Sequence, residues 1–365
     1  MRIGAPKEIK VHEYRVGLTP DAAAELTSRG HVVTVETGAG AGVDYADADY
    51  VAAGAQIAAS ADEVFETAEL IVKVKEPQPQ ECARLRPDQT LFTYLHLAAD
   101  RPQAEALMRS GATCIAYETV TDARGGLPLL RPMSEVAGRM SVQVGAHYLE
   151  KVHGGRGVLM GGVPGVAPAR VAVLGGGVSG AHAAEMALGL RADVTIFDIS
   201  TSRLAELDRQ FAGAARTAFA SRRTIAAAVA EADLVIGAVL APGAAAPKLV
   251  TREMLKTMRR GTVLVDVAID QGGCFEASRP TTHDDPVFVE EGVLHYCVAN
   301  MPGAVARTST QALGNATLPF VIAIADQGAE RAMAADPHLK RGLNIAQGTV
   351  RHPAVAEALA LPLAA

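Results

Sequence analysis

The stretch that decides the fold is Val171-Ala172-Val173-Leu174-Gly175-Gly176-Gly177-Val178-Ser179-Gly180, followed by a helix-forming segment and then by Thr195-Ile196-Phe197-Asp198. An apolar, β-branched run enters a Gly-x-Gly-x-x-Gly turn, and a second apolar run ends in an acidic residue. This order of elements is that of a βαβ unit that binds a dinucleotide. The stretch therefore predicts a parallel sheet with covering helices.

Each glycine of the motif has a separate physical task. Gly175 allows the tight turn, Gly177 lets the backbone approach a pyrophosphate, and Gly180 lets the helix pack closely on the strand. The pyrophosphate would lie on the positive end of the helix, whose first residues are Val178 and Ser179. Three glycines in a chain that has 35 could mark only a tight turn. The register of strand, helix, second strand and acid favours a cofactor site.

The acid at the end of the second strand predicts which dinucleotide binds. Asp198 is placed where a carboxylate can accept hydrogen bonds from both ribose hydroxyls of the adenosine half. The same carboxylate would repel a 2′-phosphate. NAD is therefore predicted rather than NADP.

Length and composition are those of an ordinary α/β protein. A chain of 365 residues suggests two domains. The net charge of −6 and the absence of long Lys/Arg runs argue against a nucleic-acid partner. The start of the chain lacks the pattern of a signal peptide, and no apolar run has the length of a membrane span. We therefore expect a cytoplasmic protein without a membrane partner.

The four cysteines show neither a C-x-x-C pair nor the spacing of metal ligands. They are Cys82, Cys114, Cys274 and Cys297. Reduced thiols and no metal site are predicted.

Up to about Glu118, short strands alternate with helices, as in a parallel sheet with crossover helices. Thr19 is the predicted N-cap of the first helix and Pro20 its first residue. Because this part contains no Gly-x-Gly-x-x-Gly, it suits a substrate domain. Strands are expected at 2–6, 31–37, 70–75, 90–95 and 112–118, and helices at 20–29, 47–53, 61–68 and 102–110.

The rest of the chain predicts a second domain and a return to the first. A long helix over 134–152 is expected to cross between domains, and the glycine-rich run 154–165 to form a loop or flap at the boundary. A break at 301–303 precedes another long helix, about 310–327, which would carry the chain back. Further strands are expected at 193–198, 234–240 and 262–268, and helices at 202–211 and about 252–258.

We therefore predict two doubly wound, Rossmann-like parallel sheets, with a cleft between them and two long crossover helices. Residues 1–130 and 306–365 would form a discontinuous substrate domain. Residues 131–305 would form the NAD-binding domain.

Four charged side chains are expected at the carboxyl ends of strands, where parallel sheets bind ligands. Arg15 follows the first strand, and Lys75, His96 and Asp270 end later ones. An arginine fork can hold a carboxylate through two hydrogen bonds, and a lysine adds a charge-assisted contact. A histidine beside a cofactor suits proton transfer near neutral pH.

Each of the four also has a purely structural explanation. Arg15 and Lys75 could be solvated surface cations. His96 could be a hydrogen-bonded core histidine, and Asp270 could cap a turn. The residues by themselves leave these alternatives open.

Short segments spread along the chain carry a family likeness. Through them the sequence resembles NAD-dependent alanine dehydrogenase from residue 1 to about 320, and the likeness thins out in the last forty residues. The family usually has Asn, Ala and Gly where this chain has His12, Gly17 and Arg191. The segments are Gly4-x-Pro6-x-Glu8, Glu13-Tyr14-Arg15-Val16, Thr19-Pro20, Lys75-Glu76-Pro77, Leu95-His96-Leu97-Ala98, Met133-Ser134-Glu135-Val136-Ala137-Gly138, Asp266-Val267-Ala268-Ile269-Asp270-Gln271-Gly272-Gly273 and Asn300-Met301-Pro302.

The resemblance implies reversible oxidative deamination of L-alanine to pyruvate and ammonia, with hydride transfer to NAD, by a homohexamer. It implies that Arg15 and Lys75 bind the substrate carboxylate, that Asn300 contacts the substrate, and that His96 and Asp270 are the acid/base pair. His96 would hydrogen-bond the carbonyl or carbinolamine oxygen and Asp270 would handle the water or amine proton, although the reverse is possible.

The resemblance also implies a set of cofactor contacts. Arg203, one helical turn after Asp198, could stack on adenine or be a surface cation. The implied cofactor positions, with the glycine motif included, are Ser134, Gly175, Gly177, Val178, Ser179, Gly180, Asp198, Arg203, Val239, Ala268, Ile269, Asp270, Val298, Asn300 and Met301.

Three other functions compete with this one. The nucleotide-binding part of a proton-translocating transhydrogenase shares the architecture but needs no amino-acid pocket. A non-catalytic NAD-sensing module and another amino-acid dehydrogenase, such as a saccharopine-type enzyme, are further alternatives. The four charged residues favour an amino-acid dehydrogenase over the first two.

Overall fold

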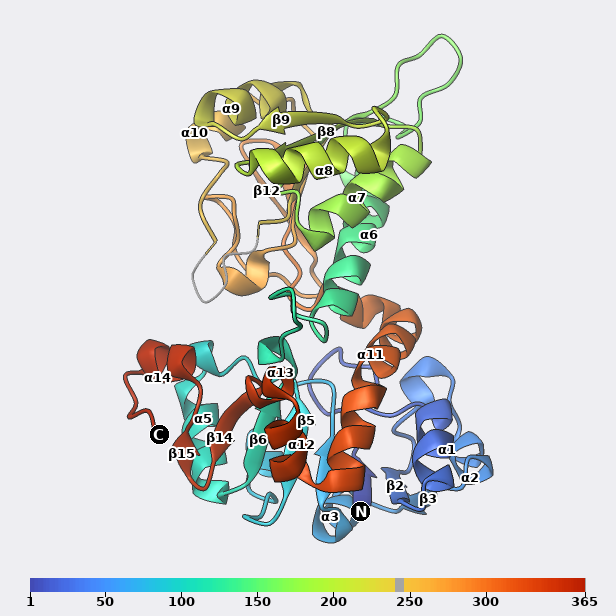
Figure 1. Ribbon diagram of the computed structural model, residues 1–365. Coiled ribbons are helices and arrows are strands. Elements are labelled where there is room, and N and C mark those ends of the chain that lie inside the picture. Colours follow the sequence, from blue (N-terminus) through green and yellow to red (C-terminus); the bar gives the residue numbers. More distant parts are fainter. Residues whose placement is uncertain (240–245, 365) are drawn as a thin grey trace. The chain divides into compact units, whose positions relative to one another are not determined.

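The structure is a computed structural model that describes residues 1–239 and 246–364. The chain forms two compact units: the first combines Met1–Met133 with Gly303–Ala365, and the second is Ser134–Pro302. Figure 1 shows a central sheet with helices around it in each unit. The second unit is thus an insertion within the chain of the first.

The sheet of the first unit has the strand order β15-β14-β6-β5-β4-β1-β2-β3. Strands β1 to β6 pair in parallel, whereas β14 pairs antiparallel with both β6 and β15. The parallel part is doubly wound, and its direction reverses between β1 and β4, the place where such sheets bind ligands. The strands are β1 (Arg2–Ala5), β2 (Val32–Glu36), β3 (Gln56–Ala58), β4 (Leu70–Val72), β5 (Thr90–Thr93), β6 (Thr113–Ala116), β14 (Leu343–Ala346) and β15 (Thr349–Val350).

The helices of the first unit cover this sheet, and the C-terminal residues take part in its core. Ile345, Val355 and Leu359 pack with side chains of the N-terminal part, among them Leu91 and Leu107. Burying such a side chain stabilises the fold by about 1.5–3 kcal/mol. The helices are α1 (Pro20–Ser28), α2 (Asp47–Ala52), α3 (Ala61–Thr67), α4 (Pro79–Cys82), α5 (Arg101–Ser110), α11 (Ala306–Gln327), α12 (Ala329–Ala335), α13 (Pro337–Lys340) and α14 (Pro353–Leu359), with the short 3-10 helices η1 (Ala41–Val43), η2 (Leu97–Ala99) and η3 (Tyr117–Thr119).

The sheet of the second unit has the strand order β12-β13-β11-β10-β7-β8-β9. All neighbours pair in parallel except β12 and β13, which form an antiparallel hairpin. The strands are β7 (Arg170–Leu174), β8 (Asp193–Asp198), β9 (Arg216–Phe219), β10 (Leu234–Gly237), β11 (Val263–Asp266), β12 (Val287–Glu290) and β13 (Val293–Tyr296). The helices are α6 (Arg131–Tyr148), α7 (Val178–Gly189), α8 (Thr201–Phe211), α9 (Arg222–Glu231) and α10 (Arg252–Leu255), with η4 (Lys151–His153), η5 (Ile269–Gln271) and η6 (Met301–Val305).

The predicted α/β fold of two doubly wound sheets is confirmed, and so is the N-cap of α1, where the Thr19 side chain accepts a hydrogen bond from Ala22 N. Several predicted strands end early. The strand expected to reach Lys75 stops at Val72, because beyond it a glutamate side chain, Glu8, accepts the backbone hydrogen bond of Val74. The strand predicted over 234–240 ends at Gly237, and Leu240 lies outside the described residues.

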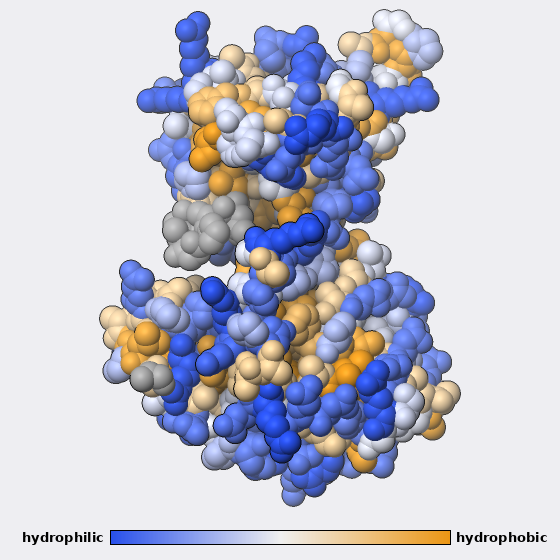
Figure 2. Space-filling view, viewed as in Figure 1, coloured by the Kyte–Doolittle hydropathy of each residue, from blue (hydrophilic) through white to orange (hydrophobic). Residues whose placement is uncertain are grey.

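The segments expected to connect the domains also differ in detail. Helix α6 begins in the first unit and continues into the second, whereas α11 lies wholly in the first unit and the chain returns through η6. The glycine-rich segment 154–165 forms a loop of the second unit, and Figure 1 shows it extending away from the body of that unit. Figure 2 shows mostly hydrophilic side chains on the visible face of each unit. In residues 1–239 and 246–364 no helix has the length and apolarity of a membrane span.

Candidate active site

The glycine turn of the second unit has the geometry that its sequence predicts. Gly175 has φ +102°, and a Cβ there would lie 2.7 Å from the carbonyl oxygen of Ala238. A Cβ on Gly180 would overlap the carbonyl oxygen of Gly175, whereas a Cβ on Gly177 would meet no heavy atom within 4 Å among the described residues. Gly175 and Gly180 therefore shape the turn, and Gly177 leaves open space in front of it.

The start of α7 is suited to an anion. Gly177 is its N-cap, and among the described residues no side chain caps the helix. The first backbone N–H groups of a helix have no partner inside the helix, and together they attract negative charge. The open space at Gly177 and the uncapped helix together fit the pyrophosphate of a dinucleotide.

The strand-terminal acid and the following arginine hold the turn from two sides. Asp198 accepts hydrogen bonds from Gly176 N (2.8 Å) and Ser200 N (2.8 Å), and Arg203 Nε donates to the Gly176 carbonyl (2.7 Å). Arg203 also pairs with Glu206 (2.7 Å). The Asp198 carboxylate keeps further acceptor capacity for ribose hydroxyls, because each of its oxygens can accept more than one hydrogen bond.

Other predicted cofactor residues of the second unit lie on three segments. Ser134, in the first turns of α6, is close to the glycine turn because its carbonyl accepts a hydrogen bond from the Ser179 hydroxyl (2.9 Å). Val239 follows β10 and approaches Gly175. Ala268 and Ile269 lie at the start of η5, Val298 and Asn300 lie between β13 and η6, and Met301 is the first residue of η6. Asn300 has a left-handed backbone (φ 63°).

The loop that carries Asp270 is organised by a buried carboxylate that sequence reasoning missed. Asp266 ends β11 and accepts hydrogen bonds from Cys274 N (2.9 Å), Ala268 N (3.1 Å) and the Ser278 hydroxyl. Burial raises the pKa of Asp266, and these hydrogen bonds partly offset the rise. Asp270 itself is exposed on η5. Asp266 therefore fixes the backbone and leaves Asp270 available to a ligand.

In the first unit, Arg15 is a buried cation with a defined orientation. Its side chain is 2% exposed, and it donates to both carboxylate oxygens of Glu13 (2.6 and 2.5 Å) and to Met133 Sδ (2.9 Å). Burial alone would lower the pKa of Arg15, but Glu13 more than offsets this and raises it. Arg15 is thus not a solvated surface cation. The missed signal is the i, i+2 spacing of Glu13 and Arg15, which in extended chain places both side chains on one face.

Lys75 lies in a cluster of charges at the end of β4. Its Nζ is 3.8 Å from Glu76 Oε2, and Glu76 also pairs with Lys10. Burial tends to raise the pKa of Glu76, but Lys75 and Lys10, with a smaller contribution from the nearby His96, lower it. The structure therefore brings Lys75 and His96 to the same carboxylate, which sequence reasoning did not single out.

His96 is exposed and is held by its backbone. It has a left-handed conformation (φ 52°), and its N–H donates to Glu118 Oε1 (2.6 Å). Its ring stacks on Tyr94, with 5.7 Å between centroids and an interplanar angle of 8°. The alternative that His96 is a core histidine is therefore wrong, and the imidazole is accessible to a ligand.

A second lysine of the same segment has a different environment. Lys73 is fully buried between Glu8 Oε2 (3.1 Å) and Glu81 Oε1 (2.8 Å). Burial raises the pKa of Glu8, and the ammonium of Lys73 partly offsets the rise. Glu8 also accepts a hydrogen bond from Val74 N (2.6 Å). This closed set of charges shapes the segment that presents Lys75.

The three departures from the family pattern fall at particular backbone conformations. His12 and Arg191 have φ of 58° and 63°. Gly adopts this left-handed region more readily than Arg, whereas Asn and His are both among the other residues that are enriched there. A Cβ on Gly17 would lie within 2.8 Å of the backbone carbonyl carbon of Val72. The departures therefore change local strain and packing and remove none of the charged groups of the site.

Taken unit by unit, the two sets of residues offer different chemistry. The first unit presents two cations and an accessible imidazole at the carboxyl ends of its strands. The second presents a helix start that no described side chain caps, an acid at the end of β8 and an exposed carboxylate on η5. An anionic small molecule suits the first set and a dinucleotide the second.

Two family models match the chain in sequence. They are "Alanine dehydrogenase/PNT, N-terminal domain" over residues 4–137 and "Alanine dehydrogenase/PNT, C-terminal domain" over residues 141–353. An alanine dehydrogenase of Halomonas elongata is 62% identical over 99% of this chain and 97% of its own. One of Mycobacterium tuberculosis is 54% identical over 99% and 98%.

Two solved structures resemble the fold over nearly its whole length. An L-alanine dehydrogenase matches with a TM-score of 0.96 and 53% identity, covering 99% of each chain. A transhydrogenase from Sinorhizobium meliloti matches with a TM-score of 0.82 and 27% identity, covering 97% of this chain and 100% of its own.

Proposed function

We propose how the site residues divide the work from one premise: the chain belongs to the alanine dehydrogenase/PNT family and is an NAD-dependent L-alanine dehydrogenase. The observation that carries the activity is the 62% identity to an alanine dehydrogenase over nearly the full length of both chains. The reaction converts L-alanine and water to pyruvate and ammonia. NAD, when bound, would supply the acceptor for the hydride that leaves Cα.

Arg15 and Lys75 bind the carboxylate of alanine in this proposal. Glu13 is a positioning residue, because its two hydrogen bonds to Arg15 fix the plane of the guanidinium. A fixed fork and a second cation together orient a small substrate by its carboxylate, so that Cα has one position. Asn300 adds a polar contact to the substrate.

His96 and Asp270 form the acid/base pair in this proposal. Loss of hydride and a proton leaves an imine, which water attacks to give a carbinolamine that releases ammonia. One group must remove protons and another must hold the oxygen of the carbinolamine. We assign the oxygen to His96 and the water or amine proton to Asp270.

The cofactor contacts are assigned to the second unit. Gly175, Gly177 and Gly180 with Val178 and Ser179 would bind the pyrophosphate, and Asp198 the adenosine ribose. Arg203 would line the adenine side. The remaining assigned contacts are Ser134, Val239, Ala268, Ile269, Asp270, Val298, Asn300 and Met301. The open space at Gly177 and the uncapped start of α7 support this assignment.

We assign substrate binding to residues 1–130 with 306–365 and NAD binding to residues 131–305. We further propose that the protein assembles as a homohexamer and is located in the cytoplasm. The four cysteines, all within the described ranges, are buried and unpaired, which suits a reducing compartment. Light scattering tests the hexamer, and cell fractionation tests the location.

The deciding experiment follows NADH formation spectrophotometrically from L-alanine and NAD at alkaline pH. The wild type should form NADH, and His96→Ala and Asp270→Asn should each lose about 10²–10⁴-fold in kcat. The His96→Ala variant should still bind NADH, and Asp285→Asn, at an exposed position of the second unit, should keep its activity. A wild type that is inactive with alanine but active in hydride exchange between dinucleotides would favour the transhydrogenase alternative.

A further inference from the structure

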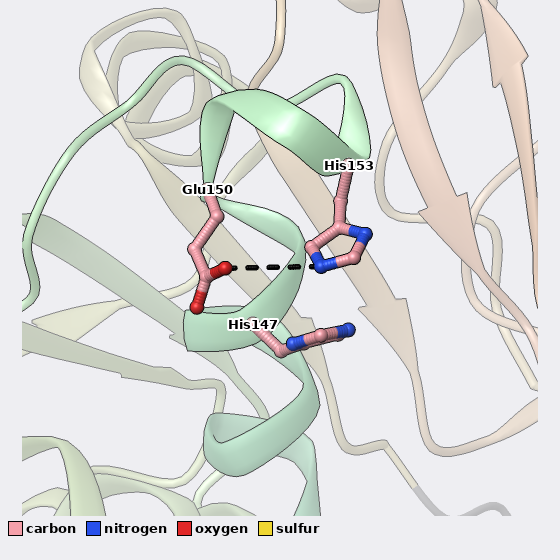
Figure 3. Close-up of side chains that lie close together, drawn as sticks. All are labelled: His147, Glu150 and His153. Carbon is pink, nitrogen blue, oxygen red and sulfur yellow. Dashed lines mark ion pairs between the residues drawn. The ribbon is translucent and has the colours of Figure 1, made fainter.

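The end of α6 carries three side chains whose ligand atoms converge. His147 lies in the last turn of α6, Glu150 in the connection after it, and His153 at the end of η4. One ligand atom of each lies within 4.8 Å of the other two. Figure 3 shows Glu150 facing His153, with the ring of His147 next to both. None of the three belongs to the proposed alanine or NAD sites.

The break in the helix brings these residues together. On a continuous α-helix, positions 147 and 153 would point roughly 120° apart around the axis. Here α6 ends at Tyr148, and Glu150 has an extended backbone (φ −64°, ψ 143°). The chain then turns back and places the two imidazole rings 3.9 Å apart between centroids.

Local hydrogen bonds fix this turn. The backbone N–H groups of His153 and Gly155 both donate to the Glu150 carbonyl, each at 3.1 Å. Gly154 has φ +89°, and a Cβ on Gly155 would overlap the Tyr148 carbonyl oxygen. The start of the glycine-rich segment is therefore needed to fold η4 back onto α6, and the ligand atoms are held by short-range structure.

The donor set is that of a transition-metal site. Two imidazoles and a carboxylate bind Zn²⁺ in proteins, with water as a fourth ligand. At bond lengths of about 2.0–2.2 Å, two ligand atoms of a tetrahedral site lie about 3.3–3.5 Å apart. His153 Nε2 and Glu150 Oε2 are 3.7 Å apart, close to this spacing, and the ligand atom of His147 lies within 4.8 Å of theirs, so side-chain rotations would have to close the remaining gap. We propose that His147, Glu150 and His153 bind one Zn²⁺.

The surroundings support a cation between these groups. The neighbouring Arg156 is paired with Asp233 and not with the cluster carboxylate. Tyr148 packs edge-on against the rings of His147 and His153, with 5.1 and 5.8 Å between centroids, which limits their rotation. Zinc would join the end of α6 to η4 and stabilise the turn before the glycine-rich loop.

The test is a zinc titration of the metal-stripped full-length protein against a chromophoric chelator, under reducing conditions. The wild type should bind one equivalent of Zn²⁺, and His153→Ala and His147→Ala should bind it at least about 100-fold more weakly. Val152→Ala is the matched control: Val152 lies between the ligands in sequence, is 82% exposed and should leave the affinity unchanged.

Two further measurements keep the result independent of folding and of the dehydrogenase reaction. Circular dichroism must show each variant folded, and Glu150→Gln replaces an exposed side chain if a histidine variant unfolds. Saturating Zn²⁺ should raise the melting temperature of the wild type and of Val152→Ala but not of Glu150→Gln. Equal zinc affinity in the wild type and in folded His147→Ala or Glu150→Gln would overturn the proposal, and so would a wild type that binds no zinc.

Discussion

The two units share one parallel strand order and differ in the connection between their first strand and the next helix. In the first unit, residues 6–19 form a long loop between β1 and α1, and it carries Glu8, Glu13 and Arg15. In the second unit, only residues 175–177 separate β7 from α7. Both connections lie where the direction of the sheet reverses. The same topology therefore presents buried charges in one unit and bare backbone in the other, and the connection, not the fold, decides the ligand.

The largest expected effect comes from removing the cation that the first unit presents. Lys75→Ala should lower kcat/KM for L-alanine about 10³–10⁴-fold, equivalent to about 4–5 kcal/mol, because a charge-assisted contact to the carboxylate is lost. NADH affinity should change less than about 2-fold. Steady-state kinetics and NADH fluorescence titration measure the two quantities. A parallel loss of NADH affinity would mean that the two connections do not divide substrate and cofactor.

Lys73, two residues before Lys75, should contribute to the free energy of unfolding and not to substrate binding. Lys73→Met leaves Glu8 and Glu81 buried without their shared cation, which should cost about 3–5 kcal/mol of unfolding free energy. Urea denaturation of the two variants makes the comparison, and Lys75→Ala should lose less than about 1 kcal/mol. If Lys73→Met were as stable as the wild type, the buried charges would not be what holds the first connection.

In the second unit, substitutions of Gly180 and Gly177 should have different effects: the first should reduce both stability and NADH binding, the second NADH binding alone. Gly180→Ala should lower the melting temperature and weaken NADH binding at least about 100-fold, because its Cβ overlaps the Gly175 carbonyl. Gly177→Ala should keep the melting temperature and lose NADH affinity, because its Cβ enters open space where the pyrophosphate is expected. Calorimetry and fluorescence titration distinguish the two. A Gly177→Ala variant with normal affinity would place the pyrophosphate elsewhere.

The smallest effect at neutral pH concerns a core histidine of the second unit whose ring nitrogens have no hydrogen-bond partner among the described residues. His295 in β13 is fully buried and stacked on Phe288, and burial lowers its pKa from 6.5 to about 4. Because the unfolded chain binds this proton more readily, the stabilisation is complete above pH 6.5 and is lost as the pH falls towards 4. The loss should reach about 3 kcal/mol. Urea denaturation between pH 7 and 4.5 should show a shallower pH dependence in His295→Gln, and equal slopes would contradict the shift.

Sequence patterns predicted most of the parallel strands of each unit, but the short parallel strands β3, β9 and β13, of three or four residues each, were not predicted. The glycine motif and the acid at Asp198 indicated the second sheet, its cofactor and the roles of Gly175 and Gly180, because these signals are local and steric. The antiparallel strands were missed. Strand β14 is short and pairs with β6, which is distant in sequence, so no local period marks it. The same holds for the hairpin of β12 and β13, whose strands have four residues each.

The residues of the candidate site could be predicted from the sequence, but their burial and their ion-pair and hydrogen-bond partners could not. Arg15, Lys75, His96 and Asp270 could be named from their places after strands, and their roles stay predictions. Their supporting carboxylates were not found, because Glu and Asp are usually exposed and sequence alone does not reveal burial. Glu76 and Asp266 support the site only in the folded chain, where lysine side chains lie next to Glu76 and backbone N–H groups bind Asp266.

The return of the chain to the first unit has a consequence for biosynthesis. β6 ends at Ala116, but its partner β14 begins at Leu343, about 225 residues later. At about 5–20 residues per second, a ribosome needs about 10–45 s to deliver it. During that time the apolar side chains that Val355 and Leu359 will cover stay uncovered, while the whole second unit has already emerged. The nascent chain can therefore complete its NAD-binding unit before its first-made sheet is closed, and residues translated after that unit finish the first core.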